Sequence, residues 1–169
     1  MADQPRSTLR AQVGDGLDPV AGTARWTAAM RAQESARPDR LFDDPLAATL
    51  AGEPGHALLE QLGEGSSVAI VVRTRFVDEA FIDITAGPDG PGQIVLLAAG
   101  MDTRAYRLDL PATTTVFELD RPELLQLKDT LLAGTPAPRC IRCPLGVDLV
   151  GDWSVVLTAA GFDQTQPTI

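Results

Sequence analysis

The chain of 169 residues has the length of one domain, and its 44% hydrophobic and 22% charged residues are typical of a globular protein. No apolar run is long enough to cross a membrane, and the opening residues MADQPRSTLR lack the apolar centre of a secretion signal, so we expect a cytoplasmic protein. The net charge of −9 and the scattered arginines disfavour a nucleic-acid partner.

The N-terminal part is expected to be helical after a short arm. Residues 1–18 are polar and contain two glycines, which predicts a mobile arm. A helix should begin near Pro19 and continue through TARWTAAMRAQES, a stretch of helix formers. Asp43-Asp44-Pro45 is typical of a second helix start, before PLAATLAG. His56 has no Ser or Cys partner in a nucleophile motif, and we expect it at the surface or at a helix start.

A long helix is predicted over residues 66–85. Five apolar residues recur at every fourth position and predict the core face: Val68, Val72, Phe76, Ala80 and Ile84. Arg73 and Arg75 lie beside this stripe. Taken by itself, Arg73 is best explained as a surface arginine that pairs with Asp78 or Glu79.

The run from Gln93 to Arg107, QIVLLAAGMDTRAYR, predicts a buried parallel strand that turns into a helix. The β-formers end in Ala98, Ala99 and Gly100, whose small side chains let the backbone approach a ligand closely. Asp102 or Thr103 can cap the helix that follows. Turns of this kind bind nucleotides in α/β folds.

A second strand is predicted from Thr113 to Leu119, within a run that ends in VFELD. Its carboxylates, Glu118 and Asp120, come about 20 residues after the turn, where nucleotide-binding folds place an acid on the ribose hydroxyls. The helix PELLQLKDTLLAG should follow, with Gly134 as its C-terminal stop.

A third strand is predicted from Cys140 to Val147, before Asp148-Leu149 and a helix that Asp152 should cap. The pair C-I-R-C could be redox-active or half of a zinc site. We favour two core or edge cysteines, because the chain has no second Cys pair and one histidine. No metal site is assigned. Alternating strands and helices predict an α/β fold with a parallel sheet and right-handed crossovers.

The run AAGMDTRAYRL, followed by VFELDRPELLQLK, resembles the leucine carboxyl methyltransferase family and its bacterial relatives, which include polyketide O-methyltransferases. The resemblance extends upstream over TARWTAAMRAQE, RPDRLFDDPLAA and VRTRFVDEAF, and downstream over VDLVGDWSVVLTAAGFDQTQPTI. The chain departs from the family twice. It has Ala98-Ala99-Gly100 where the family usually has Gly-Ala-Gly, and it stops at Ile169, where the family continues with further strands.

The resemblance implies a Rossmann-like methyltransferase fold that binds S-adenosyl-L-methionine. Residues 19–169 would form a partial domain, with a helical cap over 19–86 and a Rossmann-like part over 93–169. Its three strands would lie in the order 3-2-1, and the later strands would be missing. The resemblance also assigns the donor contacts. These are Arg73 for the carboxylate, Ala98, Ala99 and Gly100 for the loop, Asp120 for the ribose, and Asp148 and Leu149 for the adenine. Arg75 remains undecided, and Asp102 is better explained as a helix cap.

The implied activity is O-methylation, in secondary metabolism, of a carboxylate or hydroxyl on a small molecule such as a polyketide-type metabolite. An in-line methyl transfer needs no dedicated nucleophile, and we assign no catalytic residue. A nicotinamide-dependent dehydrogenase is disfavoured because the loop lacks the G-x-G-x-x-G spacing. The alternative is a shortened methyltransferase-like protein that binds a ligand or partner without methyl transfer. The end at Ile169 predicts poor catalysis, and an exposed edge on strand 94–97 that self-association or a partner chain covers.

Overall fold

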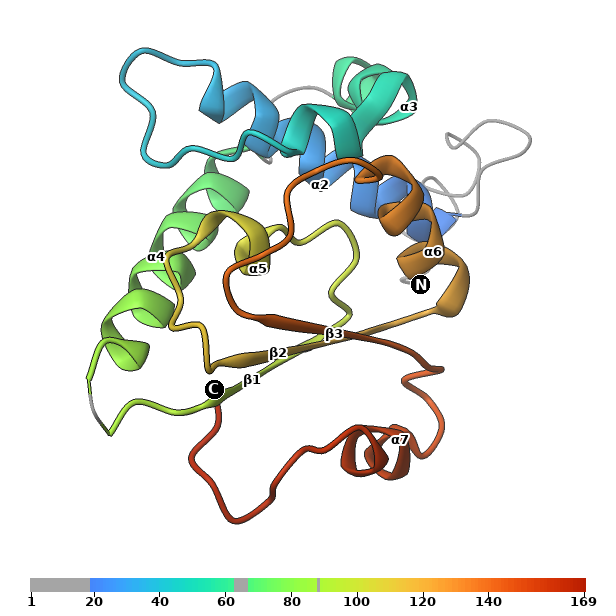
Figure 1. Cartoon of the computed structure of the whole chain (residues 1–169). Coiled ribbons are helices and arrows are strands. Elements are labelled where there is room, and N and C mark those ends of the chain that lie inside the picture. Colours follow the sequence, from blue (N-terminus) through green and yellow to red (C-terminus); the bar gives the residue numbers. More distant parts are fainter. Residues whose placement is uncertain (1–18, 63–66, 88) are drawn as a thin grey trace, which may run out of the picture.

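The computed structural model describes residues 19–62, 67–87 and 89–169, so the predicted mobile arm lies outside the described residues. Figure 1 shows a parallel sheet with most of the helices on one face and α7 alone on the other. We call these the helical face and the α7 face. None of the helices in the described part of the chain is long and apolar enough to cross a lipid bilayer.

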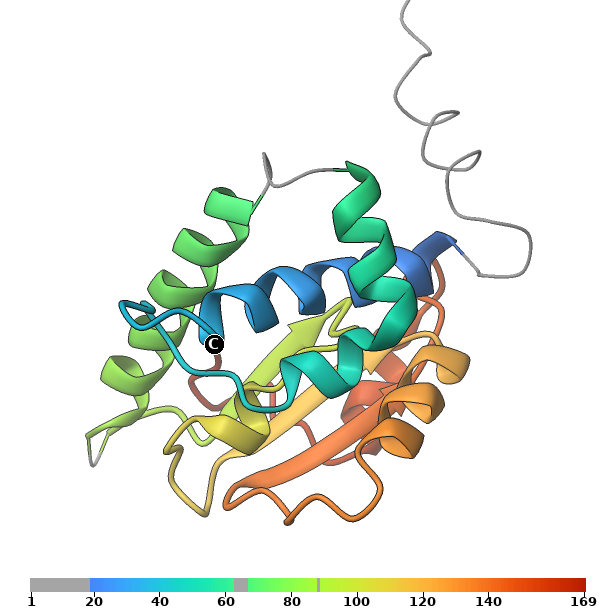
Figure 2. The same ribbon diagram turned by 90° about the horizontal axis from the view of Figure 1, so that it is seen from above.

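The helical face is covered by the N-terminal helices, and Figure 2 shows α2 lying across the sheet. These helices are α2 (Pro19–Ser35), α3 (Ala47–Leu62) and α4 (Ser67–Thr85). Helix α2 begins at Pro19, as predicted. Helix α3 is longer than predicted because the chain continues through a kink at Gly52 and Pro54 into a second helical segment. His56 lies exposed near the start of that segment, as expected.

The predicted core face of α4 is wrong. Val68, Val72 and Phe76 are 71%, 55% and 69% exposed, and Ile84 is also exposed. The buried residues of this helix lie on another face and are mostly polar: Thr74, Asp78, Phe81 and Thr85. The spacing of the apolar residues, one at every fourth position, correctly predicted a helix. Which face of that helix is buried depends on partners elsewhere in the chain.

The sheet contains β1 (Gln93–Leu97), β2 (Thr115–Asp120) and β3 (Ile141–Gly146), all parallel and in the predicted order. The connecting helices are α5 (Arg104–Arg107) and α6 (Pro122–Leu131), and α7 (Trp153–Ala159) follows β3. Gly134 has a φ of 87° just after α6, which supports its predicted role as the helix stop. The strands and helices therefore form the predicted α/β arrangement.

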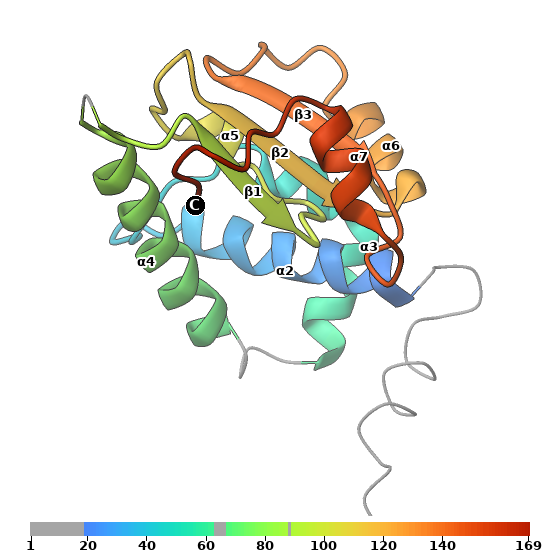
Figure 3. The same cartoon turned by 90° about the horizontal axis from the view of Figure 1, so that it is seen from below.

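Residues near Ile169 lie along the edge of β1 that faces away from β2 (Figure 3). Gln93 forms a parallel bridge with Thr168, and the Val95 N–H donates to the Ile169 carbonyl at 2.8 Å. The buried Gln93 side chain also donates to the Asp163 carbonyl at 2.8 Å and accepts from its N–H at 2.9 Å. This edge was expected to be unpaired, and the structure corrects that expectation for the first part of β1.

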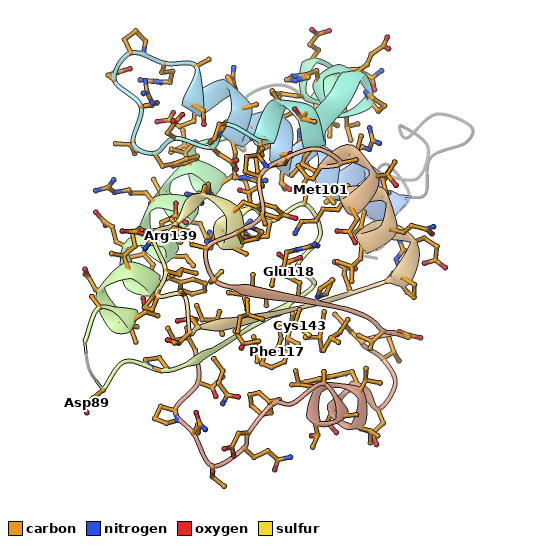
Figure 4. The ribbon with its side chains drawn as sticks, viewed as in Figure 1. Asp89, Met101, Phe117, Glu118, Arg139 and Cys143 are labelled. Atoms are coloured by element: carbon orange, nitrogen blue, oxygen red, sulfur yellow. The ribbon has the colours of Figure 1, made fainter. Side chains whose placement is uncertain are left out.

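The two faces of the sheet differ in chemistry. Phe117 points toward the α7 face and packs with Leu157 and Phe162, whereas Glu118 points to the helical face (Figure 4). Cys140 packs with Ile94 and Val116, and Cys143 packs in the cluster below the sheet that contains Phe117. Burial raises the pKa of both thiols, and both cysteines are free. Packing against different clusters supports the interpretation of Cys140 and Cys143 as core residues.

Candidate functional site

The turn after β1 has a strained backbone. Ala98 has a φ of 54° and Gly100 a φ of 49°, and Ala98 is the only non-glycine residue with a positive φ in the described ranges. The Ala98 side chain makes this conformation cost about 1–2 kcal/mol relative to the right-handed region. The Asp102 N–H donates to the Ala99 carbonyl at 2.8 Å and closes the turn. The chain therefore reverses sharply where β1 ends.

Gly100 lies where two other segments approach the backbone. A Cβ atom built on it would lie 3.3 Å from the Ala24 Cβ of α2 and 3.8 Å from Oδ2 of Asp120. The Gly100 N–H donates to the same Oδ2 at 2.7 Å. Oδ1 of Asp120 accepts from the Arg121 N–H, also at 2.7 Å. The Asp120 carboxylate is thus fixed at the end of β2, and each oxygen keeps a lone pair for a further donor.

A cavity of about 630 Å³ lies at this turn, between α2, α4 and the carboxyl ends of β1 and β2. We call it the turn cavity. Its wall includes five of the predicted donor-site residues: Arg73, Ala98, Ala99, Gly100 and Asp120. Helix α2 contributes Ala24, Thr27 and Arg31, and α4 contributes Ile70 and Val77. Side chains about 50 to 100 residues apart in sequence therefore meet around one space.

The remaining two predicted residues, Asp148 and Leu149, do not line the turn cavity. They follow β3, and the Val147 N–H donates to the Asp120 carbonyl at 2.8 Å. Asp148 is exposed and accepts from the Val150 N–H at 3.0 Å, whereas Leu149 packs against the cluster on the α7 face. These two residues lie at the same edge of the sheet as Asp120 but outside the cavity wall.

Arg73 and Arg75 differ in their partners. Within the described part of the chain, the Arg73 guanidinium has no hydrogen bond or salt bridge, and it lines the turn cavity. Arg75 donates to the Leu41 carbonyl at 2.8 Å and forms an ion pair with Glu79. The pairing of Arg73 with Asp78 or Glu79, considered from the sequence, is absent. Arg73 is therefore available to an anionic ligand.

A buried charged cluster behind the cavity was not predicted. Asp44 of the α2–α3 connection accepts from Nε of Arg31 at 2.9 Å and from Oγ1 of Thr103 at 2.7 Å. Nη2 of Arg31 donates to the Met101 carbonyl at 2.6 Å. Asp44 therefore binds α2 to the turn after β1, in addition to its predicted role before α3.

Asp78 of α4 holds two further arginines. Its carboxylate pairs with Arg107 through Nη2–Oδ1 at 2.7 Å and Nη1–Oδ2 at 2.6 Å, and with Nε of Arg104 at 2.8 Å. Arg104 also pairs with Asp102. We call these six residues the cavity cluster: Arg31, Asp44, Asp78, Asp102, Arg104 and Arg107. The cluster joins three helices to the strained turn.

Asp102 serves the turn itself. Its Oδ1 accepts from the Arg104 N–H at 2.7 Å, which supports the interpretation of Asp102 as a cap for α5. Burial acts to raise the pKa of this carboxyl, but the Arg104 charge and the backbone hydrogen bond outweigh it and lower the pKa below its usual value. The carboxylate is therefore ionised and engaged within the protein.

A second charged cluster lies between β2, β3 and α6, and consists of Glu118, Lys128 and Arg142. Oε2 of Glu118 accepts from Nζ of Lys128 at 2.7 Å and from Nε of Arg142 at 2.9 Å. Glu118 and Lys128 have no exposed surface. Burial lowers the pKa of Lys128, and the Glu118 charge opposes that shift. We call this group the enclosed cluster.

One sequence signal could have found part of the cavity cluster. Arg104 and Arg107 are three residues apart and therefore lie on one face of a helix. Two arginines that follow so closely after an apolar strand are expected to be buried, and buried cations need acidic partners. Their partners, Asp78 and Asp44, lie 26 or more residues away in sequence, so no local pattern identifies them.

Comparisons with known proteins give the family of the chain. The family model described as leucine carboxyl methyltransferase matches residues 24–169. A protein of Parafrankia sp. strain EAN1pec is 44% identical over 160 residues, which cover 88% of this chain and 51% of the relative. A protein of Mycolicibacterium smegmatis is 43% identical over 164 residues, which cover 88% of this chain and 54% of the relative. Both carry the name "Putative S-adenosyl-L-methionine-dependent methyltransferase". The chain spans about half the length of the curated relatives it matches.

Proposed function

The chain belongs to the leucine carboxyl methyltransferase family, and on that premise we propose that it binds S-adenosyl-L-methionine in the turn cavity and takes part in O-methylation. The helices followed by a parallel sheet are consistent with the Rossmann-like methyltransferase fold of such proteins. In this proposal, residues 19–169 form the donor-binding domain. Residues 19–86 are its helical cap, and residues 93–169 are its Rossmann-like part.

The residues around the turn cavity fit this donor chemically. The Arg73 guanidinium can form two parallel hydrogen bonds with a carboxylate. Asp120 keeps acceptor capacity for ribose hydroxyls, and it is fixed by the backbone N–H groups of Gly100 and Arg121. Ala98, Ala99 and Gly100 supply a wall of small residues. The donor set therefore matches an amino acid joined to an adenosine.

Asp148 and Leu149 are proposed to meet the adenine, although they lie outside the cavity wall. Their position supports this, because β3 ends beside β2, where Asp120 would hold the ribose. The Asp148 carboxylate would accept from the exocyclic amine, and Leu149 would line the ring. A ligand that spans from Arg73 to Asp148 would cross the carboxyl ends of all three strands, where open α/β sheets bind their ligands.

When bound, S-adenosyl-L-methionine supplies an activated methyl group on a positively charged sulfur. The residues of this chain contribute position and exclusion of water. Arg73 would anchor the amino-acid part of the donor and Asp120 its ribose, while α2 and α4 line the cavity around it. No side chain of the chain has to act as a nucleophile.

The acceptor is proposed to be an oxygen, either a carboxylate or a hydroxyl of a small molecule such as a polyketide-type metabolite. The name of the family supports a carboxyl acceptor. A place in secondary metabolism and a cytoplasmic location belong to the same proposal, and cell fractionation tests the location. Methyl transfer from labelled donor to a panel of carboxylic acids and phenols tests the acceptor class.

The observation that carries the proposal is the unpaired Arg73 guanidinium at the wall of the turn cavity. Titration calorimetry with S-adenosylhomocysteine on the wild type, Arg73→Ala and Arg75→Ala tests it. Arg73→Ala should lose about 10- to 150-fold in affinity, because charged hydrogen bonds contribute roughly 1.5–3 kcal/mol. Arg75→Ala is the matched control, since Arg75 lies on the same helix but pairs with Glu79.

Donor binding should also stabilise the fold by about 2.7 kcal/mol at a ligand concentration 100 times the dissociation constant. A folded wild type with neither heat nor a shift in melting temperature at millimolar ligand would overturn the proposal. A protein that binds the donor but transfers no methyl group would support the alternative function, which is ligand or partner binding without catalysis.

Self-association or a partner chain that covers the last part of the β1 edge and the apolar side of α4 is part of this proposal. Leu97 is 51% exposed at the end of β1, and Val68, Val72 and Phe76 form an exposed apolar stripe. Sedimentation at several protein concentrations, for the wild type and for Phe76→Glu, tests the association. A wild type that stays monomeric throughout would contradict it.

A further inference from the structure

The turn cavity has more arginines than one carboxylate needs. Arg31, Arg73, Arg104 and Arg107 all contribute to its wall. Arginines grouped around a cavity ordinarily bind phosphates, because each guanidinium offers several donors to the phosphate oxygens. By arginine content alone, the cavity would suit an adenine nucleotide at least as well as an adenosyl amino acid.

Three of these arginines are paired with three aspartates of the chain. Asp44 pairs with Arg31 at 2.9 Å, and Asp78 pairs with Arg107 at 2.6 Å. Asp78 and Asp102 both pair with Arg104. The cavity cluster is therefore formally neutral. Among the described residues that line the cavity, Arg73 is the one arginine without a salt bridge.

Asp78 has the central place in this pairing. Asp78 belongs to α4 and is 4% exposed, and its carboxylate accepts from both Arg104 and Arg107 of α5. Those two guanidinium groups have side chains only 14% and 6% exposed. Without Asp78, Arg107 would keep Asp44 as its acidic partner, at 3.8 Å, and the hydrogen bond from its Nε to Oγ1 of Thr103, at 3.1 Å. Two cations would then face the cavity with fewer internal partners.

We infer that Asp78, assisted by Asp102, determines ligand specificity by withholding Arg104 and Arg107 from phosphate groups. The turn cavity thereby takes an adenosyl ligand with a single carboxylate and rejects adenine nucleotides with phosphate chains. This inference rests on the proposed function for the identity of the preferred ligand. A neutral cluster beside one free guanidinium discriminates by charge, since each extra phosphate charge finds no unpaired partner.

The test compares two ligands that share an adenosine, S-adenosylhomocysteine and adenosine diphosphate. Calorimetry would measure both affinities for the wild type, Asp78→Asn, Asp102→Asn and Asp83→Asn. In Asp78→Asn, the affinity for adenosine diphosphate relative to S-adenosylhomocysteine should rise about tenfold or more, because a charged hydrogen bond becomes available to phosphate. Asp102→Asn should show a smaller rise in the same direction, because Arg104 keeps Asp78. Added salt should weaken the gained binding.

Asp83→Asn is the matched control, because Asp83 lies exposed on the same helix and does not line the cavity. Its affinity ratio should equal that of the wild type. An unchanged ratio in folded Asp78→Asn and Asp102→Asn would overturn the inference. If Asp78→Asn does not fold, Asp102→Asn decides, since Asp102 is less deeply buried.

The experiment separates this inference from the proposed function. A wild type that fails to bind S-adenosylhomocysteine contradicts the proposed function. A gain of adenosine diphosphate binding in Asp78→Asn would still support the withholding of the arginines. The reverse result, donor binding without any gain, would leave the function standing and remove the specificity role of Asp78.

Discussion

The cavity cluster and the enclosed cluster both bury charges on the helical face of the sheet, but they face different surroundings. The cavity cluster joins α2, α4 and α5 to an irregular turn and lies along an open space. The enclosed cluster joins β2, β3 and α6, and its Glu118 and Lys128 are fully buried. The cavity cluster forms part of the wall of the turn cavity, whereas the enclosed cluster connects two strands and a helix.

This difference shows that burial of a charged group does not by itself reveal whether the group serves stability or ligand binding. Buried ion pairs contribute little net stability compared with apolar residues, yet loss of one partner is costly. In the enclosed cluster that cost falls on the fold. In the cavity cluster it also changes the surface that a ligand meets, because Arg31 holds the Met101 carbonyl and Arg104 follows the turn. Substitutions in the two clusters should therefore separate stability from binding.

The largest expected effect is on the enclosed cluster. Glu118→Gln leaves the fully buried Lys128 without its carboxylate partner and leaves Arg142 with Asp129 alone. It should lower the free energy of unfolding by about 3–5 kcal/mol. Urea denaturation measures this loss. Affinity for S-adenosylhomocysteine, measured on the folded fraction, should stay unchanged because Glu118 does not line the turn cavity. Glu60→Gln, on the exposed side of α3, is the control. A loss below about 1 kcal/mol would contradict the comparison.

The second effect lies within the turn cavity. Asp120→Ala should lower donor affinity by about 1.5–3 kcal/mol, because it removes the acceptor for ribose and frees the Gly100 N–H. Asp102→Ala should lower it less, since that carboxylate is engaged with Arg104. Calorimetry with S-adenosylhomocysteine compares the two variants. Equal losses, or a larger loss for Asp102→Ala, would mean that the ligand-facing carboxylate has been wrongly assigned.

The elements around this comparison were largely predictable because their signals are local. The run Ile94 to Leu97 followed by small residues identified β1 and its turn, and the acidic end of β2 identified Asp120. Pro122 marked the start of α6. Each of these signals depends on neighbours within a few residues, so the chain alone contains it.

The clusters were not predictable for the opposite reason. Asp78 is buried because Arg104 and Arg107, 26 and 29 residues further on, neutralise it. The apolar stripe of α4 therefore turned out to be exposed, although its spacing suits a core face. Lys128 is the one lysine of the chain, and its pairing with Glu118 depends on how α6 packs on β2. Whether such charged residues are buried depends on ion pairs between different helices and strands, and residue spacing in the sequence does not reveal those pairs.

A smaller effect is expected from the strained backbone of the turn beside the cavity cluster. Ala98→Gly should raise the free energy of unfolding by about 1 kcal/mol, because glycine adopts a positive φ without the Cβ penalty. Ala133→Gly, in an exposed turn after α6, is the control and should give no gain. Urea denaturation of both variants measures the difference. A loss of stability in Ala98→Gly would show that the turn is not strained in solution.

The smallest expected effect concerns the pH dependence that Asp102 contributes. The pKa of this carboxyl is lowered in the folded state from its ordinary value of 3.8, chiefly because Arg104 outweighs burial. A lowered folded pKa means that the unfolded chain binds the proton more readily, so the stabilisation is present above 3.8 and is lost as pH falls through the folded value. The difference in unfolding free energy between the wild type and Asp102→Asn should therefore shrink as the pH is lowered from 6 toward 3. In an Arg104→Met background, the same comparison should change less with pH, because the cation that lowers the pKa is gone. If the difference grows on acidification, or if both backgrounds show the same pH dependence, the ion pair between Asp102 and Arg104 does not contribute to stability.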